Sequence, residues 1–178
     1  MADENGTNGT AGAGAPPLGA VPGADQPRLN VVSQYVKDLS FENPDGPRAM
    51  PNRDANSRIN VGINVQARRV SQTDMEVSLK FEASAKDNDR TIFATELVYA
   101  GVFRFQNIPE NQIEPLAMTE CARLLFPFAR QILADATRNG GFPPLLLDPV
   151  DFAAMYRDRL KRGQPGDAPN VPPPANLS

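Results

Sequence analysis

The chain has 178 residues and a formal net charge of −3, with no histidine and a single cysteine, Cys121. This composition excludes catalytic triads with histidine, imidazole general bases, and metal sites rich in His or Cys. Cys121 has no second cysteine for an intrachain disulfide and no histidine to activate it. We therefore expect no catalytic residue, no metal and no cofactor.

The two ends of the chain differ in composition from the middle. Residues 1–27 hold six Gly, six Ala and four Pro with no Lys or Arg, and residues 162–178 hold five Pro and two Gly. Such segments cannot form a core, so we predict disordered tails at 1–27 and 162–178 around one domain at 28–161. The domain has 17 basic and 17 acidic residues, which argues against nucleic acid as a partner. The first residues lack a signal-peptide pattern, and no apolar run reaches the ~18 residues of a membrane span. We expect a soluble cytoplasmic protein without direct membrane insertion.

Alternating polarity predicts strands in the first part of the domain. Residues 34–42 place Tyr35, Leu39 and Phe41 on one parity and Asp38 and Glu42 on the other, which predicts a strand with one solvent face. An irregular link should follow over 43–57, because Pro and Gly cluster at its start. Residues 59–67 and 75–83 alternate in the same way, and their short polar connection favours an antiparallel meander.

The fourth predicted strand, residues 91–105, is apolar on both parities. Phe93, Leu97 and Tyr99 lie on one parity, and Ile92 and Val98 lie on the other. Both faces of such a strand must pack against other parts of the protein, so it needs two covering layers. Helices can supply one, and the second is either another subunit or the chain's own loops.

Helical periodicity begins at about residue 110. One long helix is predicted over 110–139, with a kink near 124–126 caused by Pro127 and an end at Asn139-Gly140. A short helix should begin with Asp148 as its N-cap and run to about Lys161. The apolar segment 142–147 between them contains two prolines and is extended, so it either packs in the core or lines a surface groove.

Four segments together resemble a known family. They are Tyr35 to Pro44, Glu96 to Phe103, Leu125-Phe126-Pro127-Phe128-Ala129-Arg130, and Gly141 to Phe152 with its run Phe-Pro-Pro-Leu-Leu-Leu. In this order and spacing they resemble SecB, the bacterial protein-export chaperone family, over roughly residues 30–160. The two long tails depart from the better-known members.

The resemblance implies an α+β fold: a four-stranded antiparallel sheet followed by one long kinked helix and one short helix, assembling as a dimer of dimers. It implies a homotetramer that binds unfolded preproteins without ATP and delivers them to the translocation motor SecA. The segment 142–147 then becomes an expected groove wall rather than core.

The resemblance also assigns the site residues. Asp38, Glu42 and Glu96 match the acidic positions that dock SecA, with Ala94 in place of a larger apolar neighbour. The expected client-binding residues are Phe142, Leu145, Leu147, Phe152, Met155 and Tyr156. The expected oligomer-interface residues are Phe93, Leu97, Tyr99, Cys121, Leu124 and Phe128.

Two alternatives remain from other classes. A chaperone of a toxin–antitoxin pair would share the fold and lack the acids that dock SecA. An enzyme of the hot-dog type also packs a sheet on a long helix, but its central helix normally comes before most of the sheet, whereas here both helices follow the strands.

Overall fold

The computed structural model describes residues 26–44, 46, 58–87 and 90–163. Its elements are β1 (Arg28–Glu42), β2 (Arg58–Arg69), β3 (Asp74–Asp87), β4 (Arg90–Gln106), α1 (Glu110–Leu116), η2 (Ala117–Cys121), α2 (Ala122–Asn139) and α3 (Phe152–Lys161). The four predicted strands and the two predicted helical regions are therefore confirmed. Most of the two predicted tails, and most of the predicted link at 43–57, lie outside the described residues.

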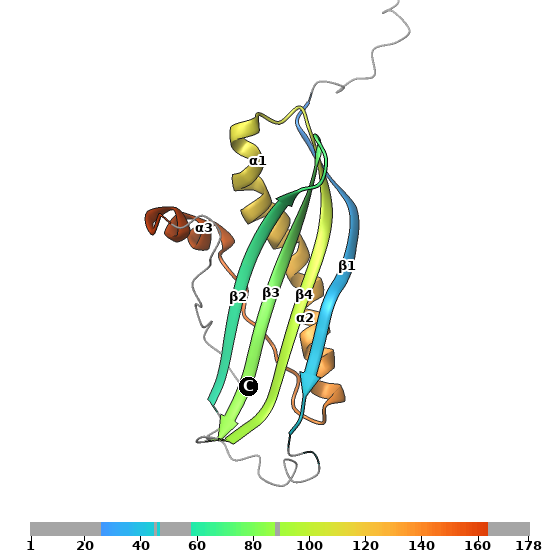
Figure 1. Cartoon of the computed structure of the whole chain (residues 1–178), viewed down its shortest axis with the longest axis vertical. Helices are drawn as coiled ribbons and strands as arrows, with labels where there is room; N and C mark the ends of the chain where they lie inside the picture. The colour runs from blue at the N-terminus through green and yellow to red at the C-terminus, as the bar shows by residue number, and fades with distance from the viewer. Residues whose placement is uncertain (1–25, 45, 47–57, 88–89, 164–178) are drawn as a thin grey trace, which may run out of the picture.

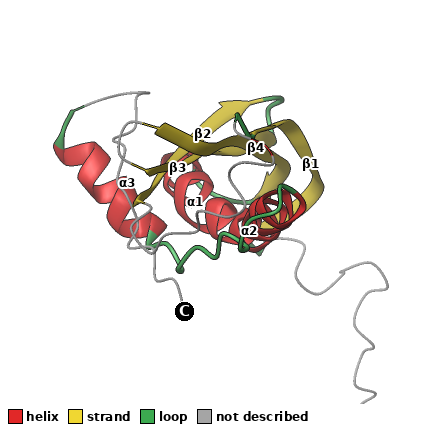
Figure 2. Cartoon of the chain, turned by 90° about the horizontal axis from the view of Figure 1, so that it is seen from below, coloured by secondary structure: helices red, strands yellow, loops and turns green. Residues whose placement is uncertain are grey.

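The four strands form one antiparallel sheet in the order β1-β4-β3-β2. The helices lie on one side of this sheet, with α2 beneath β4 and β1 and α3 towards β2 (Figure 1 and Figure 2). We call the opposite side, which carries Ala94, Glu96 and Val98 of β4, the open face. All strands precede all helices, as the sequence indicated.

The core lies between the sheet and α2, because period-two apolar residues face a helical stripe. Phe81 and Leu97 are paired across β3 and β4 and are fully buried on the helix side. The ring of Phe81 lies 6.2 Å from that of Phe126 in α2, and Leu125 and Leu133 complete the contact layer. Side chains on the other parity therefore point to the open face.

The long helical region is interrupted by one π-helical turn, η2, and not near Pro127. The irregular turn comes before the predicted kink at 124–126, and the hydroxyl of Thr119 in this turn donates to the carbonyl of Pro115 in α1 at 2.7 Å. Pro127 is tolerated inside α2, because Arg123, whose carbonyl loses its N–H partner, is exposed to water.

The ends of α2 and α3 are set by local chemistry. α2 ends at Asn139, and Gly141 then adopts a φ of 86°, as expected for glycine after a helix. The predicted N-cap Asp148 is wrong, because the side chain of Asp151 accepts the N–H of Ala154 at 2.8 Å. Val150, between the two aspartates, packs on the core and precedes the N-cap, so α3 begins later than predicted.

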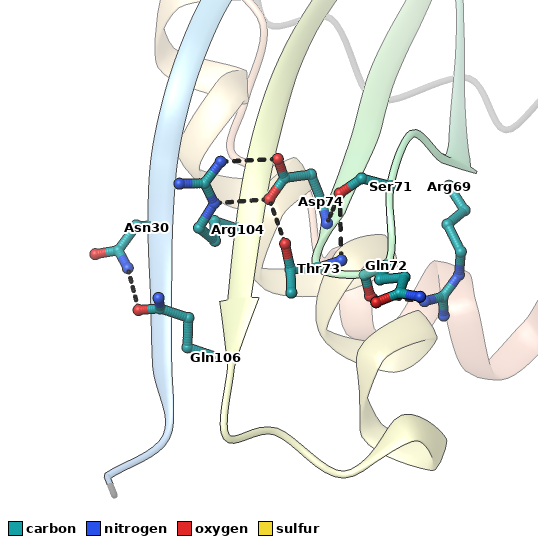
Figure 3. A network of polar contacts seen from close by, with 8 residues as sticks. All are labelled: Asn30, Arg69, Ser71, Gln72, Thr73, Asp74, Arg104 and Gln106. Carbon is teal, nitrogen blue, oxygen red and sulfur yellow. Dashed lines mark hydrogen bonds and ion pairs between the residues drawn. The ribbon is translucent and has the colours of Figure 1, made fainter. Parts of the chain in front are cut away.

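Polar contacts fix the end of the sheet at the β2–β3 turn. The hydroxyl of Ser71 accepts the N–H groups of Thr73 and Asp74, at 3.2 and 3.0 Å. The guanidinium of Arg104 in β4 donates two hydrogen bonds to the Asp74 carboxylate, of 2.8 and 2.9 Å (Figure 3). This guanidinium lowers the pKa of Asp74. The Arg104–Asp74 pair therefore links β4 to the first residue of β3, beside this turn.

Candidate functional site

The open face brings the three acids of the predicted docking site together. In the pairing of β1 with β4, Asp38 lies opposite Val98, Ser40 opposite Glu96, and Glu42 opposite Ala94. Glu96 is thus at a register position midway between Asp38 and Glu42. All three acids are exposed. The geometry that the docking prediction requires is present, and their role stays a proposal.

A β-bulge in β1 changes which side chains share this face. The register shifts between Val36 and Asp38, with Lys37 as the extra residue. Tyr35 therefore lies on the open face, where its hydroxyl donates to Glu76 at 2.6 Å, whereas Leu39 lies on the helix side opposite Leu97. The prediction that Tyr35 and Leu39 share one face is wrong, because a bulge reverses the alternation.

Beside the acids lies a like-charge pair that the sequence analysis did not single out. Glu82 of β3 lies directly opposite Glu96 of β4. Such a pair is unfavourable unless a cation intervenes. The ammonium of Lys80, two residues along β3, contacts Glu82 closely and lies 3.7 Å from Glu96. Alternation along residues 75–83 was the signal that placed Lys80 and Glu82 on the same face.

A second charge cluster lies further along the same face around Glu76. This carboxylate is only 8% exposed and accepts from Lys37 at 2.7 Å, from Tyr35 and from Arg68 at 3.3 Å. The hydrogen bond from Lys37, and then that from Tyr35, lower the pKa of Glu76 to about 2. Glu76 therefore carries a fixed negative charge at neutral pH.

The open face is hollowed where small residues meet. A hollow of about 420 Å³ is lined by Gly62 of β2 and Ala94 of β4, with Glu82 and Glu96 among the residues at its sides. Ala94 stands where the family resemblance expects a larger apolar residue. Its small side chain leaves the hollow open beside the acids.

The predicted oligomer-interface residues separate into two groups. Phe93, Leu97, Tyr99 and Cys121 are all buried within the chain itself. Burial, with a contribution from Glu120, raises the pKa of the Cys121 thiol to about 12, so the thiolate does not form at neutral pH. Leu124 and Phe128, by contrast, are 39% and 52% exposed on the outer side of α2.

α2 therefore has two apolar faces. One face packs on the sheet through Leu125, Ala129 and Leu133. The other carries Leu124 and Phe128, with Ile132 partly buried next to them. The helical periodicity of the sequence predicts an amphipathic helix but does not separate these two faces.

Four of the predicted client-binding residues lie in the core of the described conformation. These buried residues are Phe142, Leu145, Leu147 and Phe152. Met155 and Tyr156 of α3 are partly buried against the same core. Two neighbours that were not predicted, Leu146 and Leu160, are 53% and 61% exposed.

β1 adds an exposed apolar edge that the sequence analysis did not identify. Val31, Val32, Tyr35, Val36 and Leu39 are each at least 36% exposed. β1 is an edge strand of the sheet, so within the described residues no strand pairs with its outer backbone groups. Such an edge is typical of a surface that pairs with another strand.

Comparison with known proteins decides the family. Residues 23–163 match the family model described as "Preprotein translocase subunit SecB". The chain belongs to the SecB family. A SecB relative from Rhodopseudomonas palustris (strain HaA2), named protein-export protein SecB, is 49% identical over 161 residues, covering 90% of this chain and 99% of the relative. Another SecB with the same name, from Xanthobacter autotrophicus, is 54% identical over 136 residues, covering 76% of this chain and 87% of the relative.

A solved structure shares the SecB fold at low sequence identity. It is a SecB-like chaperone of Mycobacterium tuberculosis in complex with a peptide from an antitoxin, with a TM-score of 0.58 and 13% identity. The match covers 69% of this chain and 91% of that chain. Within the part of this SecB chain that the structure describes, no helix is long and apolar enough to cross a membrane. The same residues contain no cluster of His, Cys, Asp or Glu that could hold a metal ion.

Proposed function

We propose that this SecB chain is an ATP-independent chaperone, not an enzyme, which holds unfolded preproteins ready for export and passes them to SecA. Relatives that are about 50% identical over most of the chain are named protein-export protein SecB. The observation that supports delivery to SecA is the common placement of Asp38, Glu42 and Glu96 on the open face. Retention of these acids favours export over the toxin–antitoxin alternative, for which the low-identity neighbour supports the fold alone.

The open face is the proposed docking surface for SecA. Three exposed carboxylates in adjacent register attract a basic partner surface and raise its association rate, and salt weakens this attraction. The double variant Asp38→Lys with Glu42→Lys should abolish SecA binding in calorimetric titrations, with the difference from wild type greatest at low salt. The control variant Glu114→Lys with Asp158→Lys makes the same change in net charge on exposed helix positions. Equal affinities of the first variant and the wild type would refute the docking site.

The proposed client surface centres on α3 and the segment 142–147. In the described conformation the exposed area comes from Leu146 and Leu160, with parts of Met155 and Tyr156. Buried Phe142, Leu145, Leu147 and Phe152 support this surface from beneath. Apolar burial is non-directional, so such a surface suits extended unfolded segments of varied sequence.

We further propose a homotetramer built as a dimer of dimers. The exposed apolar residues of β1 and of the outer side of α2 supply two separate surfaces for contact with other copies. Native mass spectrometry should show four chains of 19.3 kDa. A monomer would refute the assembly.

A further inference from the structure

Two lysines lie among the proposed docking acids. Because Lys37 is the extra residue of the bulge, it shares the open face with its neighbour Asp38, whereas regular alternation would have placed it opposite. Lys80 reaches Glu96 from β3. An ammonium group beside a docking carboxylate competes with the basic side chain of a partner for the same oxygens.

Each lysine is held by a carboxylate outside the docking set. The ammonium of Lys37 lies 2.7 Å from Glu76, and Glu76 is fixed in turn by the hydroxyl of Tyr35 and by Arg68. Lys80 is held more closely by Glu82 than by Glu96, from which it lies 3.7 Å.

We infer that Glu76 and Glu82 are positioning residues that keep Lys37 and Lys80 away from the docking acids and so set the affinity of the open face for a basic partner. The inference rests on the proposed docking of SecA at this face. Neutralising Glu82 frees Lys80 to pair with Glu96 alone, which removes one of the three carboxylates from the docking set. Removing Lys80 leaves Glu96 free whether or not Glu82 is charged.

The test is a double-mutant cycle on the exposed Lys80 and Glu82 pair, with SecA titrated into the full-length protein. Glu82→Gln should weaken binding, by up to about fivefold for an exposed pair. Lys80→Met should bind at least as tightly as wild type. The double variant should match Lys80→Met, because Glu82 acts only through Lys80.

A direct contact between Glu82 and SecA predicts a different pattern. Glu82→Gln would then weaken binding equally with Lys80 or Met at position 80, and this result would overturn the inference. No effect of Glu82→Gln in the wild-type background would also overturn it. In both cases loss of binding in Asp38→Lys with Glu42→Lys would leave the docking proposal standing.

The Glu76 and Lys37 pair gives a second cycle of the same form. Glu76→Gln should weaken SecA binding, and Lys37→Met in the same chain should restore it. Thermal unfolding followed by circular dichroism checks that each variant is folded. Because Glu76 is buried and Glu82 is exposed, the Lys80 and Glu82 cycle decides the question even if Glu76→Gln fails to fold.

Discussion

The hydroxyl of Thr137 in α2 accepts the backbone N–H of Leu145 at 2.9 Å, which joins the last turn of the helix to the extended segment that follows it. Thr137 is fully buried, and the same hydroxyl lies 3.0 Å from the carbonyl of Leu133, to which it donates. This side chain, together with the backbone hydrogen bond from the N–H of Phe142 to the carbonyl of Thr137 at 3.1 Å, anchors the segment 142–147 to α2.

Replacing this hydroxyl should destabilise the protein. Thr137→Val keeps the shape but leaves the buried N–H of Leu145 without an acceptor, which should lower the free energy of unfolding by about 1–3 kcal/mol. Thr137→Ser keeps the acceptor and should lose only about 1 kcal/mol, for one methyl group. Urea unfolding at a fixed protein concentration, followed by circular dichroism, measures both variants. A larger loss for Ser than for Val would contradict this role.

Adjacent leucines in the segment 142–147 should respond in opposite ways. Leu147 is 2% exposed, so Leu147→Ala should cost about 2–5 kcal/mol of stability. Leu146 is 53% exposed, so Leu146→Ser should leave stability within about 0.5 kcal/mol and weaken suppression of aggregation of a denatured client. Unfolding curves and light scattering separate the two effects. Normal chaperone activity in Leu146→Ser would remove this residue from the client surface.

Much of this fold could be predicted, because apolar and polar residues alternate strictly along strands that are buried on one face only. β2 and β3 extend only a few residues beyond the predicted ranges 59–67 and 75–83. β1 begins at Arg28, earlier than the predicted residue 34, because a second register shift at Val32 breaks the alternation at its start. A bulge inserts one residue without a sequence signal as strong as Gly or Pro, so periodicity alone misses it.

The candidate site was predictable in part for the same reason. Parity along β1 and β4, together with the family resemblance, placed Asp38, Glu42 and Glu96 on one face. The partners of the nearby lysines were not predictable. Lys37 is in β1 and Glu76 is in β3, and β4 lies between these two strands in the sheet order β1-β4-β3-β2. Burial of Leu145 and Leu147 was also missed, since an extended apolar segment fits a groove and a core equally well.

The outer side of α2 should be required for assembly and not for folding. Phe128 and Leu124 are 52% and 39% exposed within one chain, so changing both to Ser should cost little stability in the monomer. Loss of their shared apolar surface should convert the proposed tetramer into smaller species in native mass spectrometry. Val70→Ser, at a residue 54% exposed in the β2–β3 turn, is the control. An unchanged tetramer in the double variant would exclude this side of α2 from the interface.

The buried Glu76 should make stability depend on pH in the acid range. The pKa of its carboxyl is lowered from 4.5 to about 2, chiefly by the hydrogen bond from Lys37 and next by that from Tyr35. Because the folded-state pKa is the lower one, the stabilisation is fully present above pH 4.5 and is lost as the pH falls towards 2. The size of this stabilisation is roughly 3 kcal/mol. Glu76→Gln has no proton to gain, so the stability difference between wild type and this variant should shrink by about that amount between pH 6 and pH 2.5.

Urea unfolding at the two pH values measures this stability difference, with Glu114→Gln, at an exposed position of α1, as the control. A difference that stays constant with pH would show that Glu76 does not titrate with folding.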